Sequence, residues 1–179
     1  MKGVVFTEFL EMVRSVHSED LLDAVLHDAA PPNGGAYTAV GTYDHHEMTN
    51  LVVAYAKHTQ TTVPEALRTF GVHLLGRFHD RFPRFFAVDG VFAFLADVNA
   101  VIHVEVHKLY SDAELPQLNV LERTETTMTV LYRSSRHLED LAEGLIVGAV
   151  AYFGEPMRIE RQPHESGGVQ FRLFRESVP

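Results

Sequence analysis

Apolar side chains recur at intervals of three and four residues through much of the first two thirds of the chain, a spacing typical of amphipathic helices. In the first of these segments the apolar face includes Val5 and Phe9. The segments AAPPNGG and RFPRFF contain prolines and glycines that should separate neighbouring helices. The predicted helices have their apolar positions within residues 4–16, 21–26, 48–55, 67–78 and 90–110.

Polar residues mark where several of these helices should begin. Ser18 is suited to cap the second helix, because its hydroxyl can accept a hydrogen bond from a free backbone N–H. Asp44 and Glu47 have the spacing of a capping box, in which each side chain bonds to the backbone of the other residue. Pro64 and Glu65 suit the first turn of the next helix.

The pattern changes in the last third of the chain, where apolar and polar residues alternate as they do in strands. Segments 119–125 and 126–132 should pair, and a Gly-Gly turn at 167–168 should join two further strands in a terminal hairpin. Between the two pairs, residues 137–153 have helical spacing, and Gly154 should end that helix. The predicted class is α+β, with a helical N-terminal part packed on a C-terminal part that contains a small antiparallel sheet and helices.

Composition narrows the class of protein. The 179 residues are 46% hydrophobic and 22% charged, which is typical of one soluble globular domain with a substantial core. A net charge of −9 argues against a nucleic-acid surface, which needs clustered lysine and arginine. The lack of cysteine excludes disulfides, iron–sulfur clusters and thiolate ligation of haem. No apolar run approaches the ~20 residues of a membrane span and no signal-peptide layout is evident, so we expect a cytoplasmic protein with no membrane partner.

Two groups of polar residues suggest a binding site. Tyr132, Ser134 and Arg136 occupy alternate positions in the segment YRSSR. In an extended chain alternate residues point to one side, so two hydroxyls and a guanidinium should converge on one or two carboxylates. Upstream, His103 lies on the strongly apolar segment VFAFLADVNAVIHVEVHKLY. Together they describe a haem site, because haem has two propionates, a flat apolar body and an iron that takes an axial nitrogen.

The order of these residues in the chain resembles a known family. The opening MKGVVF, then His103, Pro116 and the trio Tyr132-x-Ser134-x-Arg136, is similar to the haem nitric oxide/oxygen binding (H-NOX) family over essentially the whole chain. That family includes the sensor domain of soluble guanylate cyclase and stand-alone bacterial gas sensors. The resemblance makes His103 the proximal iron ligand, Pro116 the residue that bends the porphyrin, and the trio the propionate clamp.

The same resemblance implies an architecture and a function. Residues 1–179 would form one domain that binds haem b, with a helical distal part at about 1–65 and a proximal part, containing His103 and the sheet, at about 66–179. Such a domain is a sensor and not an enzyme. Because the chain ends at Pro179, we expect it to act on a separate protein, such as a histidine kinase, a cyclic-di-GMP-metabolising enzyme or a chemotaxis receptor. The expected signal is release of His103 when NO binds.

The choice of gas depends on the distal side of the haem. Oxygen-binding members of the family have a tyrosine where this chain has Leu141, and Leu74 matches a second polar position of the same network. Bound O₂ gains from a hydrogen-bond donor, whereas NO needs none. We therefore expect binding of NO, with CO as a second candidate ligand, and exclusion of O₂. The predicted distal residues are Val5, Phe9, Leu74, Phe78, Leu141 and Leu145.

The same residues also have plainer interpretations. A lone histidine on an apolar helix is more often structural than a ligand. The trio would then be a polar strand exit, with Arg136 paired to an acid such as Glu139. His107 lies one turn beyond the proximal candidate, a spacing that can bind zinc, but no third ligand is evident nearby. Three further histidines are expected to be solvated in a helix cap (His45 and His46) or to lie near the distal side (His73).

Three other functions fit parts of the sequence. A haem peroxidase or oxygenase would need polar distal groups, usually an acid–base histidine and an arginine. A haem carrier would be poorly served by a buried and clamped haem. A haem-free domain for another apolar carboxylate, such as a fatty acid, would use the same clamp and the same pocket.

Overall fold

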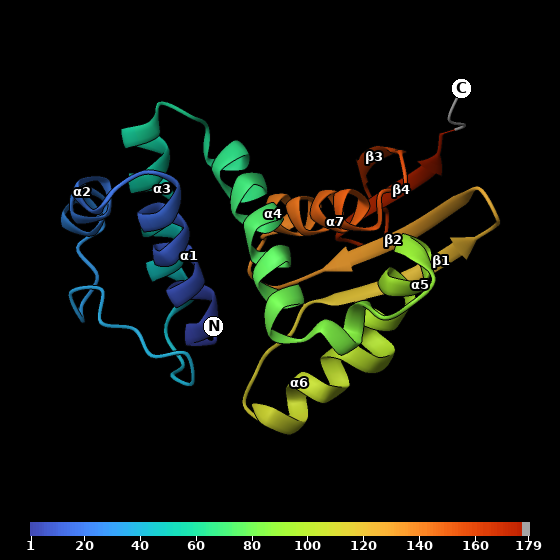
Figure 1. The fold of residues 1–179 in the computed structure, drawn as a ribbon, viewed down its shortest axis with the longest axis horizontal. Helices are drawn as coiled ribbons and strands as arrows, with labels where there is room; N and C mark the ends of the chain where they lie inside the picture. The colour runs from blue at the N-terminus through green and yellow to red at the C-terminus, as the bar shows by residue number, and fades with distance from the viewer. Residues whose placement is uncertain (177–179) are drawn as a thin grey trace.

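The computed structural model describes residues 1–176, so Pro179 lies outside the described residues. The protein has the predicted α+β fold. Helices α1 to α3 lie on one side of the molecule, the sheet lies on the other, and α4 runs between them (Figure 1). The α-helices are α1 (Gly3–Val16), α2 (Glu19–Ala29), α3 (His45–Thr59), α4 (Val63–Arg81), α5 (Gly90–Asp97), α6 (His103–Leu109) and α7 (Glu139–Phe153). The strands are β1 (Gln117–Arg123), β2 (Thr127–Arg133), β3 (Met157–Pro163) and β4 (Val169–Arg175).

Side-chain caps begin several of the helices. The predicted caps Ser18 and Asp44 are confirmed, since each side chain accepts a hydrogen bond from a backbone N–H in the first turn. The capping box predicted for Asp44 and Glu47 is wrong, because the Glu47 carboxylate instead accepts a bond of 2.8 Å from the Tyr37 hydroxyl. A complete capping box begins α4, with Thr62 at its N-cap. A short 3₁₀ turn, Pro83–Phe86, follows α4 near the predicted break.

The four strands form one antiparallel sheet in the order β1-β2-β4-β3. Both predicted strand pairs are confirmed, and pairing of β2 with β4 joins them into one sheet. In the register of β1 and β2, Leu118 lies opposite Tyr132. Met128, Val130 and Phe171 are fully buried in the core beside the sheet, so one face of the sheet is covered.

Helices α4 and α7 approach each other closely because both contain glycine at the contact. A Cβ atom on Gly71 would lie 2.5 Å from the carbonyl oxygen of Leu141, and one on Gly144 would meet the carbonyl oxygen of Arg68. Only glycine leaves room for these backbones. The approach also connects the two hydrophobic cores, since α4 contributes to the core of the N-terminal helices and to the core beside the sheet.

The predicted long helix is continuous from Gly90 to Leu109, but its hydrogen-bond pattern and its burial change along its length. Its first part, α5, buries Phe92 in the core, whereas α6 has no fully buried residue and its His103 is half-buried. Between them Val98–Ile102 forms a π turn, in which the backbone N–H of His103 bonds to the carbonyl of Val98. Within the described residues this is the one helix long and apolar enough to cross a membrane, which corrects the expectation that none qualifies. Of its apolar window 22% is buried in the domain, and the buried residues belong to α5.

Candidate functional site

A cavity of about 270 Å³ opens between the N-terminus of α1, helices α4 to α7 and the end of β2. Its wall is mostly apolar. The wall contains His103, Pro116 and all three residues of the trio, which are far apart in the sequence. Of the predicted distal residues it contains Val5, Leu74, Phe78, Leu141 and Leu145.

Phe9 is the predicted distal residue that does not line this cavity. Its ring is fully buried and makes edge contacts with Phe70 and Tyr55, at centroid distances of 5.1 and 5.8 Å. Phe9 follows Val5 by one helical turn, so the two share a face of α1. That turn packs against α3 and α4, and Phe9 therefore belongs to the core of the N-terminal helices. Its place beside the distal side of a bound haem stays a prediction.

His103 is the first residue of α6 and directly follows the π turn. Its Nδ1 lies 3.0 Å from Oδ1 of Asn99. Burial, together with a smaller contribution from the nearby His107, lowers the pKa of His103 to about 4. The imidazole is therefore neutral at pH 7, which is the form that binds a metal.

The trio does not have the extended arrangement predicted for it. Tyr132 lies in β2, but Ser134 and Arg136 lie in the turn after the strand. The Ser134 hydroxyl accepts a bond of 3.1 Å from the backbone N–H of Arg136, and this bond closes the turn. All three side chains nevertheless line the same cavity. Burial raises the pKa of the Tyr132 hydroxyl, so this group stays protonated and can donate to a carboxylate.

The guanidinium of Arg136 already holds a carboxylate. Its Nη2 donates to Oε2 of Glu114 at 2.9 Å, and its Nη1 donates to the backbone carbonyl of the same residue at 2.7 Å. The acid is thus Glu114 and not Glu139. The side chain of Arg136 is 13% exposed and that of Glu114 is 79% exposed. Arg136 is therefore fixed in the wall of the cavity, whereas its partner reaches it from the solvent side.

The other histidines lie outside the cavity wall. His107 is exposed, and it does not form a metal-binding group with its neighbours in the part of the chain that the structure describes. His73 is half-buried, its Nε2 has no hydrogen-bond partner among the described residues, and burial lowers its pKa. Neither residue lines the cavity.

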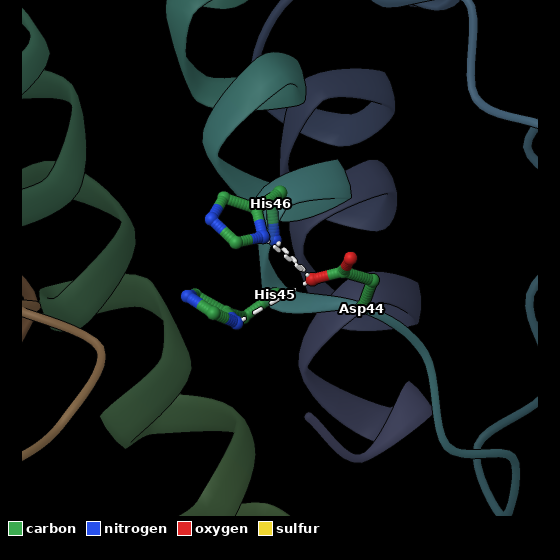
Figure 2. Close-up of side chains that lie close together, drawn as sticks. All are labelled: Asp44, His45 and His46. Carbon is green, nitrogen blue, oxygen red and sulfur yellow. Dashed lines mark hydrogen bonds and ion pairs between the residues drawn. The ribbon is translucent and has the colours of Figure 1, made fainter.

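A second cluster of potential metal ligands consists of Asp44, His45 and His46 (Figure 2). Oδ1 of Asp44 accepts bonds from the backbone N–H and from Nδ1 of His46, at 3.0 and 2.8 Å. These contacts cap the N-terminus of α3, where the helix dipole disfavours a cation. The side chains of Asp44 and His46 are mostly exposed, as expected of a solvated cap.

Two residues that bond to side chains of the cavity wall were missed by reasoning from the sequence. Asn99 bonds to the imidazole and Glu114 bonds to the guanidinium. The only signal in the sequence was that Asn99 precedes His103 by four residues, which places both on one side of a helix. Glu114 gave no signal, because an acid in the polar segment SDAELP is typical of a solvated turn.

The chemistry of the wall fits haem. Because Nδ1 of His103 faces Asn99, its Nε2 is the nitrogen free to bind iron. The apolar side chains suit the porphyrin, and the phenol of Tyr132 and the guanidinium of Arg136 suit its propionates. A bound haem would take the place that the Glu114 carboxylate now has on Arg136.

Comparisons with known proteins agree with this chemistry. Residues 2–161 match the model of the Haem-NO-binding family, so the chain belongs to that family, which consists of haem-based gas sensor domains and not of enzymes. The resemblance to H-NOX proteins inferred from the sequence is thereby confirmed.

Solved structures show the same fold. The unliganded Fe(II) H-NOX protein from K. algicida is 30% identical, with a TM-score of 0.90, and the match covers 99% of this chain and 98% of that one. An H-NOX protein from S. oneidensis in the Fe(II)NO state is 23% identical, with a TM-score of 0.90 and coverage of 99% of this chain and 100% of that one. No curated protein matches the sequence.

Proposed function

We propose that the protein binds haem b, uses it to sense NO while excluding O₂, and regulates a separate signalling protein. The observation that carries the proposal is the composition of one cavity wall. It combines a neutral imidazole, a carboxylate clamp and aliphatic side chains at Leu74 and Leu141. When bound, haem supplies a ferrous iron that takes a diatomic gas.

The residues of this chain have separate roles in the proposal. His103 offers Nε2 as the axial nitrogen. Tyr132, Ser134 and Arg136 hold the propionates and so set the orientation of the ring. Pro116 lies in the same wall, and its rigid side chain is assigned the bending of the porphyrin.

Exclusion of O₂ follows from the lack of a hydrogen-bond donor at the two distal positions. Leu74 and Leu141 offer none, and losing one donor costs a bound O₂ ~1–3 kcal/mol, or about one to two decades in affinity. Among the described residues, two further cations line the cavity, and each has a carboxylate partner. Arg81 pairs with Glu8 at 3.4 Å and Lys2 pairs with Asp112 at 3.2 Å.

The proposed switch is the bond that His103 would form with the haem iron, which bound NO would weaken. No residue of helix α6 is fully buried, so α6 is less tightly packed than α5. Loss of the bond would bias α6 between two states, which is what a sensor requires. The candidate partners are a histidine kinase, a cyclic-di-GMP-metabolising enzyme or a chemotaxis receptor in the cytoplasm, and CO is a second candidate ligand.

Absorption spectra of the reduced protein test the proposal. We expect a Soret band that NO shifts and that exposure to air does not convert to a lasting oxy form. In His103→Gly, haem should be retained only when imidazole is supplied. A stable oxy complex would contradict the argument from Leu74 and Leu141. Protein that stays colourless after haem supplementation would instead favour a haem-free domain for another apolar carboxylate.

A further inference from the structure

The side chain of Asn99 makes three hydrogen bonds next to the proposed iron ligand. Its Oδ1 accepts from the backbone N–H of Leu118 at 3.1 Å and lies 3.0 Å from Nδ1 of His103. Its Nδ2 donates to Oδ1 of Asn119 at 3.0 Å. Leu118 and Asn119 both belong to β1, so a single amide connects the histidine to the sheet.

These contacts determine which nitrogen of His103 carries the hydrogen. A backbone N–H can only donate, so the atom of Asn99 that faces Leu118 is the amide oxygen. That oxygen cannot donate, so the hydrogen shared with His103 belongs to Nδ1. A neutral imidazole has one such hydrogen, which leaves Nε2 with a free lone pair for a metal.

The backbone around Asn99 is also unusual. Asn99 lies in the π turn Val98–Ile102, where the N–H of His103 bonds five residues back instead of four. Turns of this kind are rare within helices and occur often at functional sites. The distortion of the helix therefore coincides with the pair formed by Asn99 and His103.

Strand β1 continues the connection to the other end of the site. Leu118, whose N–H bonds to Asn99, lies opposite Tyr132 of the proposed clamp in the β1–β2 register. We propose that Asn99 is a positioning residue that holds His103 in the form with a free Nε2 and links it through Leu118 to the strand of Tyr132. This inference rests on the proposed function, because it assigns that nitrogen to haem iron.

Resonance Raman spectra of the Fe(II) holoprotein test the inference through the Fe–His stretching frequency. A hydrogen bond from Nδ1–H to an acceptor makes the imidazole a more basic ligand. Asn99→Ala removes the acceptor and should lower the frequency. Asn99→Asp keeps an acceptor for both Leu118 and His103, adds negative charge, and should raise the frequency. Haem release should be about 10- to 100-fold faster in Asn99→Ala.

Asn119→Ala is the matched control. It removes the partner of Asn99 Nδ2 but leaves both bonds to Oδ1 in place, so its Fe–His frequency should equal that of the wild type. Equal frequencies in the wild type and both Asn99 variants would overturn the inference, and so would an equal shift in the control. If Asn99→Ala does not fold, the direction of the shift in Asn99→Asp decides. Wild-type protein without a haem band would overturn the proposed function together with this inference.

Discussion

The pair of Arg136 and Glu114 leads to a prediction about haem affinity. The Glu114 carboxylate occupies Nη2 of Arg136, the group assigned to a propionate. The two carboxylates should therefore compete for the same guanidinium. Glu114→Gln removes the charge of the competitor, while the backbone carbonyl of residue 114 can still accept from Nη1. We expect this variant to bind haem more tightly than the wild type.

The exposure of the Glu114 side chain determines how large the gain in haem affinity should be. The Glu114 side chain is 79% exposed, so the pair resembles a surface ion pair, which contributes about 0.2–1 kcal/mol. Release from this competition should strengthen haem binding by at most about fivefold. Arg136→Gln has the opposite effect, because it removes a charged hydrogen-bond donor from the propionate. That loss costs about 1.5–3 kcal/mol, or about ten- to a hundredfold in affinity.

The assay is titration of the haem-free protein with haem, followed by the Soret band, at low and high salt. Glu125→Gln is the control, since Glu125 is exposed in the turn between β1 and β2 and its loss changes the net charge equally. The gain in Glu114→Gln should shrink with salt, because exposed charges are screened. Weaker haem binding in Glu114→Gln than in Glu125→Gln would refute the reasoning and show that Glu114 supports the clamp.

Three further predictions concern the distal wall, the helix contact and pH. Leu141→Tyr should increase O₂ affinity by about one to two decades, measured by O₂ titration of the reduced protein; no gain would show that the new hydroxyl does not reach the ligand. Gly71→Ala should destabilise the fold by about 1–3 kcal/mol in denaturant unfolding, because its Cβ would lie 2.5 Å from the Leu141 carbonyl. Gly76→Ala on the same helix, where a Cβ meets nothing within 4 Å, should stabilise by up to ~1 kcal/mol. In the haem-free protein, the unfolded state should bind a proton at His103 from about pH 6.5 downward and the folded state only near pH 4. Stability should therefore fall by up to about 3 kcal/mol across that window, and His103→Leu should reduce the loss.

The spacing of apolar and polar residues along the chain predicted most of the fold. The period of the apolar residues predicted α1, α4 and α7, and alternation predicted both strand pairs, because each pattern reflects which side of an element is buried. The capping box at Asp44 failed for a tertiary reason. Glu47 has a better partner in the hydroxyl of Tyr37, ten residues away, and no local pattern indicates that contact.

The sequence predicted less of the site than of the fold. Residue types that carry distinctive chemistry, such as His103 and Arg136, could be chosen from the sequence, and both line the cavity. The orientation of Arg136 could not be predicted, because it depends on a turn closed by Ser134 and not on strand alternation. Phe9 is fully buried and does not line the cavity, because helical spacing gives the face of a residue but not the depth at which that face is covered.

Asn99 and Glu114 show why the partners of such residues are the hardest to predict. Each is a common polar residue with no distinctive spacing, and each owes its contact to a segment that another part of the fold positions. Asn99 meets β1 because the helix and the strand pack side by side, and Glu114 meets Arg136 because the loop before β1 passes the turn after β2. Both contacts therefore depend on where β1 lies in the sheet. If β1 shifted by one residue against β2, Leu118 would no longer lie opposite Tyr132, and the connection from the imidazole through Asn99 and Leu118 would no longer end at the clamp.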